Sequence, residues 1–246
     1  MYCKNQLSHT ITGGDNLYRL AKDYSTSVPE ILALNPNIDP YNLQIGSSVV
    51  ICADNKLPAS PWPGRHGLNE MLSLTNRMRM VWEQHVFWTR LLLISIADRL
   101  KDQGDVTVRL LKNPRDIGNI FMDYYTPAVA DNIANLLTEH LEIGAALITA
   151  LRDGQTAKAN SLNRQWYINA EKMARAFSEI NPSYDYEDIK DMLFTHLDLT
   201  KKEVAMRLAG SFPIEIETFD QLEREAMMMA DAFTRGIIEQ FPQRFA

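Results

Sequence analysis

Two β-type segments and two helical segments succeed one another in the first 52 residues. Residues 8–12 predict a strand that stops at the following pair of glycines, where backbone freedom permits a tight turn. Apolar residues at i, i+3, i+4 and i+7 predict a helix from Leu17 to Tyr24. Asp15 is its predicted N-cap, because a carboxylate can accept hydrogen bonds from the first backbone N–H groups.

The second helix has its own start and stop signals. Ser27 and Glu30 form a capping box with Pro29 in the first turn. Pro36 ends this helix, because the residue before a proline disfavours the helical conformation. Residues 47–52 predict a strand able to pair antiparallel with the first. The predicted order is strand, helix, helix, strand.

The remaining chain has a helical pattern throughout. Residues 54–67, rich in proline and glycine, predict an extended linker. The predicted domains are therefore 1–53 and 68–246, joined by this linker. Helical spacing predicts helices at 68–100, 105–112, 113 onward, 126–154, 155–180 and 184–210, and a last one capped at Thr218. The fold class predicted is a small α+β domain (βααβ) plus a larger all-α helical bundle.

The bundle contains an internal repeat. Residues 133–143 align with residues 189–199 at an offset of 56, which pairs His140 with His196. The same offset pairs Phe121 with Phe177, Asn113 with Asn169, and Gly154 with Gly210. We interpret this as duplicated helix pairs related by a pseudo-two-fold axis. Both histidines are expected at equivalent, buried positions without a carboxylate partner.

Three histidines of the bundle are candidates for a metal or ligand pocket: His85, His140 and His196. Helical bundles build metal sites from side chains on facing helices. The Glu-x-x-His pattern of di-metal bundles is missing, however, since Leu137 and Leu193 stand three residues before the last two. The favoured interpretation is that the histidines hydrogen-bond within the core. No catalytic residue and no cofactor are predicted, and a metal stays open.

Composition and charge narrow the function classes. The chain is 46% apolar and 23% charged, which is typical of a globular protein. A net charge of −6 and no Lys/Arg cluster longer than a pair argue against nucleic acid as a partner. No apolar run approaches the roughly 18 residues of a membrane span. The first residues also contain no hydrophobic signal region, which predicts no export by the general secretory route unless the N-terminus is trimmed.

The two cysteines are Cys3, which precedes the first predicted strand, and Cys52, which ends the second. Antiparallel pairing would bring them together, so a disulfide is one interpretation. Two free thiols in a reducing compartment is the favoured one.

The first domain resembles the lysin motif (LysM), a small carbohydrate-binding module. The resemblance rests on Gly14, Asp15, Leu17, Leu20, Ala21, Tyr24, Ile31, Asn35, Leu43, Gly46, Val49 and Ile51. Three residues depart from the family pattern. Asn16 stands where Ser or Thr is usual, Ser47 where Gln is common, and Cys52 where Pro is common.

The resemblance implies binding of N-acetylglucosamine-containing glycans, such as peptidoglycan or chitin, in a groove between two turns. Carried over by position, the site residues are Gly13, Gly14, Asp15, Asn16 and Leu17 on one side, with Asn35, Pro36, Asn37 and Ile38 on the other. Backbone amides there would bind acetamido groups, and Leu17 and Ile38 would supply apolar walls.

The expected function is non-catalytic glycan binding that localises the helical domain to the cell wall or spore envelope. The resemblance extends to spore-envelope LysM proteins of spore-forming bacteria, which are made in the mother cell without a signal peptide. A cytoplasmic location is the alternative. The alternative function is a LysM-targeted metal-dependent or small-molecule enzyme with its site in the bundle. A protein partner of the helical domain is a further option.

Overall fold

The computed structural model describes residues 6–12, 15–24, 26–40, 43–52 and 65–246. The chain divides into two compact units, Met1–Trp62 and Pro63–Ala246. Each unit is described below by itself.

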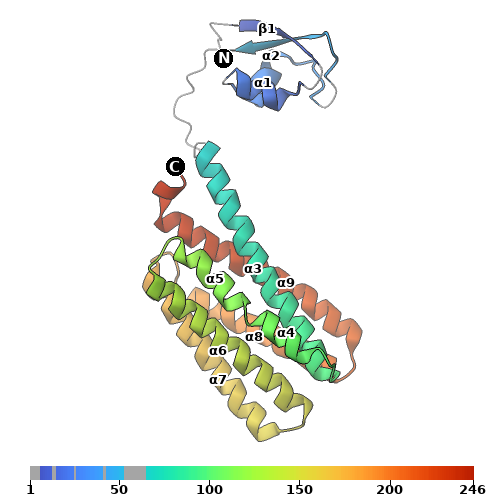
Figure 1. Cartoon of the computed structure of the whole chain (residues 1–246), viewed down its shortest axis with the longest axis vertical. Helices are drawn as coiled ribbons and strands as arrows, with labels where there is room; N and C mark the ends of the chain where they lie inside the picture. The colour runs from blue at the N-terminus through green and yellow to red at the C-terminus, as the bar shows by residue number, and fades with distance from the viewer. Residues whose placement is uncertain (1–5, 13–14, 25, 41–42, 53–64) are drawn as a thin grey trace. The chain divides into compact units, whose positions relative to one another are not determined.

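The first unit is a βααβ module (Figure 1). Its elements are β1 (Gln6–Thr10), α1 (Leu17–Asp23), α2 (Val28–Leu34) and β2 (Ser48–Cys52). The strands pair antiparallel, with Leu7 opposite Ile51 and His9 opposite Val49. The predicted element order and strand pairing are therefore confirmed.

One face of β2 and the apolar sides of both helices form the core of this unit. The buried apolar residues are Ile11, Leu17, Leu20, Ala21, Ile31, Val49 and Ile51. Cys52, at the end of β2, is buried and disulfide-bonded, so the favoured free thiol is wrong for this residue. Cys3 lies outside the described residues.

The helix caps agree with the sequence at α2 and differ at α1. Ser27 and Glu30 form the predicted capping box at α2. At α1 the cap is Asn16, whose side-chain oxygen accepts from the backbone N–H of Arg19 at 2.8 Å. Asp15 lies one residue too early for this role. It accepts instead from the N–H and the hydroxyl of Thr12, both at 2.8 Å, and so closes the preceding turn.

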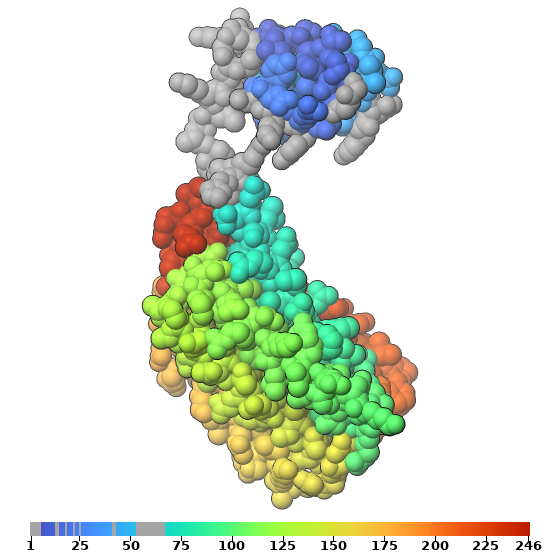
Figure 2. Space-filling view, in the orientation of Figure 1, coloured from blue at the N-terminus to red at the C-terminus, as the bar shows by residue number. Residues whose placement is uncertain are grey.

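The second unit is an all-α bundle, as predicted, built of three helical hairpins (Figure 1). The first hairpin pairs α3 (Arg65–Ala97) with α4 (Gln103–Leu110) and α5 (Asn113–Met122), the second pairs α6 (Pro127–Arg152) with α7 (Thr156–Ile180), and the third pairs α8 (Tyr186–Leu208) with α9 (Phe212–Gln240). A short 3₁₀ turn, η1 (Pro242–Arg244), follows α9. Figure 2 shows the side chains of α3 to α6 forming one continuous face of this unit.

Two predicted helix starts are displaced. Helix α3 begins at Arg65, inside the predicted linker. Helix α9 begins at Phe212 with Pro213 in its first turn, a position that suits proline. Thr218 is consequently not a cap. It is buried within α9, where its hydroxyl donates to the carbonyl of Ile214, as threonine does inside helices.

The internal repeat extends to all three hairpins, which replaces the predicted two-fold relation. Phe121, Phe177 and Phe233 recur at a spacing of 56, and their ring centroids lie 4.4–6.1 Å apart in the core. Each hairpin also has one left-handed residue near its turn: Arg99 (φ 54°), Gly154 (φ 66°) and Gly210 (φ 70°). Helix α3 of the first hairpin was missed by the sequence comparison, because arginine occupies its glycine position and His85 precedes His140 by 55 residues.

None of the helices in the described part of the chain is both long and apolar enough to cross a membrane.

Candidate functional site

The first unit has a hollow of about 540 Å³ beside the turn that follows α2. It is lined by Asn35, Pro36, Asn37, Ile38, Asp39, Gln44, Ser47 and Ser48. The second side of the predicted groove thus lines one cavity. The sequence did not predict Asp39, Gln44, Ser47 and Ser48 as lining residues. In a polar turn, a residue that contacts a ligand has the same character as one that only faces solvent.

Only part of the first side of the predicted groove falls within the described residues. Gly13 and Gly14 fall outside the described residues. Asp15, Asn16 and Leu17 do not line the hollow, and Leu17 is a core residue with 3% of its surface exposed. The Nε2 atom of His9 lies 3.0 Å from Asp15, and this hydrogen bond, with two from Thr12, lowers the pKa of Asp15 to about 2. Asp15 is therefore ionised at neutral pH.

The Asn35 side chain is turned into the fold. Its amide nitrogen donates to the carbonyls of Ile31 at 2.6 Å and Val50 at 2.7 Å. Its oxygen accepts from the N–H of Val50 at 2.9 Å. Asn35 therefore ties the end of α2 to β2, and the exposed Asn37 and half-buried Ile38 remain as side chains that can face a sugar.

In the helical unit the three candidate histidines meet. His85, His140 and His196 come one from each hairpin and are 2%, 3% and 5% exposed, so the burial predicted for His140 and His196 is confirmed. Their ring centroids are 6.3, 5.7 and 6.4 Å apart, close to an equilateral triangle. One nitrogen from each ring lies within 4.8 Å of the other two. The arrangement can hold one metal ion.

Each ring is oriented by a partner on the last helix of its own hairpin, α5, α7 or α9. The Nδ1 atom of His85 bonds Asn113 at 3.0 Å, that of His140 bonds Asn169 at 3.2 Å, and that of His196 bonds Glu225 at 2.9 Å. All three partner atoms are oxygens, so each Nδ1 carries the hydrogen. For His85 and His140, which burial keeps neutral, Nε2 is consequently the unprotonated nitrogen.

The two asparagines are themselves held in place. The amide nitrogen of Asn113 donates to the carbonyl of Val81, and that of Asn169 donates to the carbonyl of Leu136. Both carbonyls belong to the residue four positions before the histidine. This repeated contact fixes which end of each amide faces the ring.

Sequence reasoning missed these partners. The spacing of 56 that links Asn113 to Asn169 also reaches Glu225, but the change of residue type hid the third member. The expectation of no carboxylate partner is therefore wrong for His196.

Burial decides the protonation of the other two histidines. It lowers the pKa of His85 to about 3, with a further contribution from His196. Burial and the neighbouring rings likewise hold the pKa of His140 well below its usual range. A neutral imidazole is the form that binds metals.

A small cavity of about 20 Å³ adjoins the histidines. Thr89, Gly144 and Thr200 line it, and each stands four residues after one of the three histidines. The remaining wall is apolar and includes Ile148 and Trp166. The Thr89 hydroxyl oxygen is buried and has no hydrogen-bond partner among the described residues. The space is sufficient for one water molecule.

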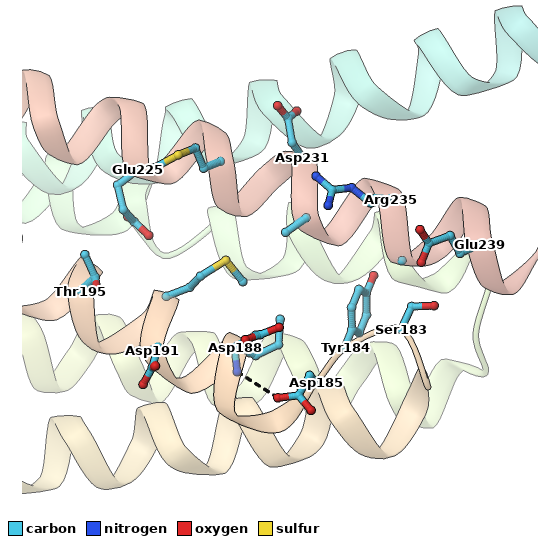
Figure 3. Close-up of a pocket in the computed structure, with 15 residues that line it drawn as sticks. Ser183, Tyr184, Asp185, Asp188, Asp191, Thr195, Glu225, Asp231, Arg235 and Glu239 are labelled. Carbon is cyan, nitrogen blue, oxygen red and sulfur yellow. Dashed lines mark hydrogen bonds between the residues drawn. The ribbon is translucent and has the colours of Figure 1, made fainter.

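An acidic groove of about 660 Å³ lies between α8 and α9 (Figure 3). Its charged lining residues are Asp185, Asp188, Asp191, Glu225, Asp231, Glu239 and one cation, Arg235. Glu225 belongs to this groove and also accepts the hydrogen bond from His196. Its second carboxylate oxygen is buried without a hydrogen-bond partner among the described residues. Glu225 thus connects the groove to the histidines.

A buried charge cluster joins the first and third hairpins. The Nη1 atom of Arg90 lies 2.7 Å from a carboxylate oxygen of Glu203 and 2.7 Å from one of Glu215. Both carboxylates are 1% exposed. Burial raises the pKa of Glu203 to about 7; Arg90 opposes this effect, whereas Glu215 adds to it.

We expect Glu203 to make the helical unit less stable as pH rises. Its folded pKa lies above its ordinary value of 4.5, so the folded state favours the protonated acid. The stabilisation is fully present below pH 4.5 and is lost as pH rises through about 7. Urea unfolding of the wild type and of Glu203→Gln measures this effect from pH 5 to 8. The free energy of unfolding should fall over this range, on the order of 2–3 kcal/mol, in the wild type alone. Equal slopes in both proteins would contradict it.

The folds and cavities define a two-unit protein: a βααβ module with an open hollow, and a three-hairpin bundle with a buried histidine cluster. Residues 9–51 match the LysM domain family, so the first unit is a LysM domain. No curated protein and no solved structure matches the chain.

Proposed function

We propose that the protein binds N-acetylglucosamine-containing glycans, such as peptidoglycan or chitin, through its LysM domain. The match of residues 9–51 to the LysM domain family carries this proposal. The hollow at Asn37 and Ile38 supports it, because it combines exposed polar groups with the apolar side chains of Pro36 and Ile38, the combination that a sugar ring and its acetamido group require. In this function the LysM domain performs no catalysis and localises the helical unit.

The localisation that follows is the cell wall or the spore envelope. These are the places where a glycan with regularly repeated acetamido groups is displayed. A single small site buries little surface, so binding should be weak, on the order of micromolar to millimolar. A repeating polymer would nevertheless retain the protein, because a protein molecule that dissociates from one site rebinds at a neighbouring site.

A matched pair of substitutions tests the site. Ser48→Tyr fills the hollow from an exposed position of β2, and Ser8→Tyr places the same side chain at an exposed position of β1 that does not line it. Retention of the full chain on insoluble peptidoglycan and on chitin should fall at least about tenfold for Ser48→Tyr, which corresponds to roughly 1.4 kcal/mol.

Ser8→Tyr should bind as the wild type does. Equal retention of the two variants would place the glycan away from this hollow. No retention of the wild type on either polymer would overturn the proposed function itself.

A further inference from the structure

We propose that His85, His140 and His196 bind one first-row divalent transition metal ion, with Zn²⁺ as the reference case, and leave its fourth coordination position facing the small cavity at Thr89. The site lies wholly in the helical unit and does not depend on glycan binding.

The first argument is convergence. Three histidines at equivalent positions of three hairpins bring one nitrogen each to within 4.8 Å of one another in the core. A tetrahedral zinc ion holds its nitrogens at about 2.0–2.1 Å, which puts them roughly 3.5 Å apart. The rings therefore have to close by about 1 Å, a shift that small ring rotations supply.

The second argument is orientation. In metal sites the ligating histidine donates its other ring N–H to a carboxylate, amide or carbonyl oxygen, which fixes the tautomer. All three rings do this here, through Asn113, Asn169 and Glu225. Because Nδ1 is used in this way, Nε2 is the nitrogen left in each ring for a metal ion.

The third argument is charge. Three neutral imidazoles leave a bound divalent ion with its full charge in a low-dielectric core. Glu225 supplies a carboxylate against one ligand, at 2.9 Å from His196. It also lines the acidic groove of α8 and α9, so the negative potential that attracts cations reaches the cluster from outside.

The fourth argument is the cavity. Three protein nitrogens leave a tetrahedral ion one open position, as in catalytic zinc sites. The unpartnered Thr89 hydroxyl lines the adjoining space, so a metal-bound water there gains a hydrogen-bond partner. With about 20 Å³ available, this position takes water or hydroxide and excludes any organic ligand.

Imidazole nitrogens suit zinc, copper, nickel and iron, whereas magnesium and calcium prefer the oxygen ligands that this set of three imidazoles does not offer. We therefore expect selectivity for the transition metals over Mg²⁺ and Ca²⁺. This contrast provides a first internal control.

The test uses the full chain after removal of metals with a chelator. Titration with Zn²⁺, followed by calorimetry and elemental analysis after dialysis, should give one ion per chain with submicromolar affinity. Co²⁺ should produce the intense visible absorption of a four-coordinate site with three nitrogen ligands and one oxygen ligand. Mg²⁺ at the same concentration should not bind.

Three variants locate the ion. His140→Ala should abolish binding, and His9→Ala, which removes a carboxylate-bonded histidine from the LysM domain, should leave it unchanged. Glu225→Gln keeps a hydrogen-bond acceptor for His196, so the bundle should fold with metal affinity reduced about 10–100-fold. If His140→Ala does not fold, the metal affinity of Glu225→Gln alone tests the proposal.

Substoichiometric Zn²⁺ in the wild type would overturn the proposal. Unchanged affinity in Glu225→Gln, or full binding by folded His140→Ala, would also overturn it. Loss of binding only in His9→Ala would move the ion to the LysM domain and overturn it as well.

Discussion

Replacing Phe233 with alanine should lower the free energy of unfolding of the helical unit by about 3–5 kcal/mol. Phe233 is fully buried and contacts the rings of Trp82 at 5.4 Å, Phe177 at 4.4 Å and Tyr184 at 5.5 Å. Its removal leaves a cavity where three hairpins meet. Well-packed aromatic walls on all sides cannot collapse to fill that cavity.

Thermal unfolding of the full chain measures this change. For a unit of this size each kcal/mol moves the melting temperature by roughly 2–4 °C, so a decrease of about 6–20 °C is expected. Phe87→Ala is the control, since Phe87 lies on α3 with half of its surface exposed. A Phe233→Ala protein that melts within 2 °C of Phe87→Ala would show that the phenylalanine cluster does not organise the bundle (a margin of about 0.5–1 kcal/mol).

Replacing Asn35 with alanine should unfold most of the LysM domain. The substitution removes three hydrogen bonds and leaves the N–H and the carbonyl of Val50 without their partner. Each unsatisfied buried group costs about 1–3 kcal/mol. A domain of this size rarely has more than about 3–5 kcal/mol of stability, so the loss approaches the whole.

Backbone amide spectra of the full chain follow this domain directly. Asn35→Ala should collapse the dispersed resonances of residues 9–51 and leave those of the helical unit in place. Asn37→Ala, two residues on and exposed, should keep the spectrum and weaken glycan retention only. If Asn35→Ala keeps the folded spectrum and loses glycan binding, Asn35 acts on the ligand and not on the fold.

Helix and strand order could be predicted because local signals agreed with the packing. The capping box at Ser27 and Glu30 satisfies backbone N–H groups at the start of α2, and the structure contains it. Thr218 carried a similar pattern, yet it lies inside α9. A preceding Phe212–Pro213 start and burial against the bundle outweighed the local signal there.

The candidate sites were predictable only in part. The repeat spacing identified His140 and His196, but not that a third hairpin brings His85 to the same point. Glu225 occupies an asparagine position, so residue type concealed the third partner. At the LysM domain, Leu17 and Asn35 illustrate a different limit, because a family position indicates neither which way a side chain turns nor whether the fold already uses it.

The distribution of the histidines, one in each hairpin, couples ligand binding to folding. No hairpin contains the complete cluster, so a ligand that contacts all three rings binds only the packed bundle. Such a ligand stabilises the folded state by mass action, by about 4 kcal/mol at a thousand times its dissociation constant. A ligand bound at the cluster would then hold together three hairpins that are distant in the sequence.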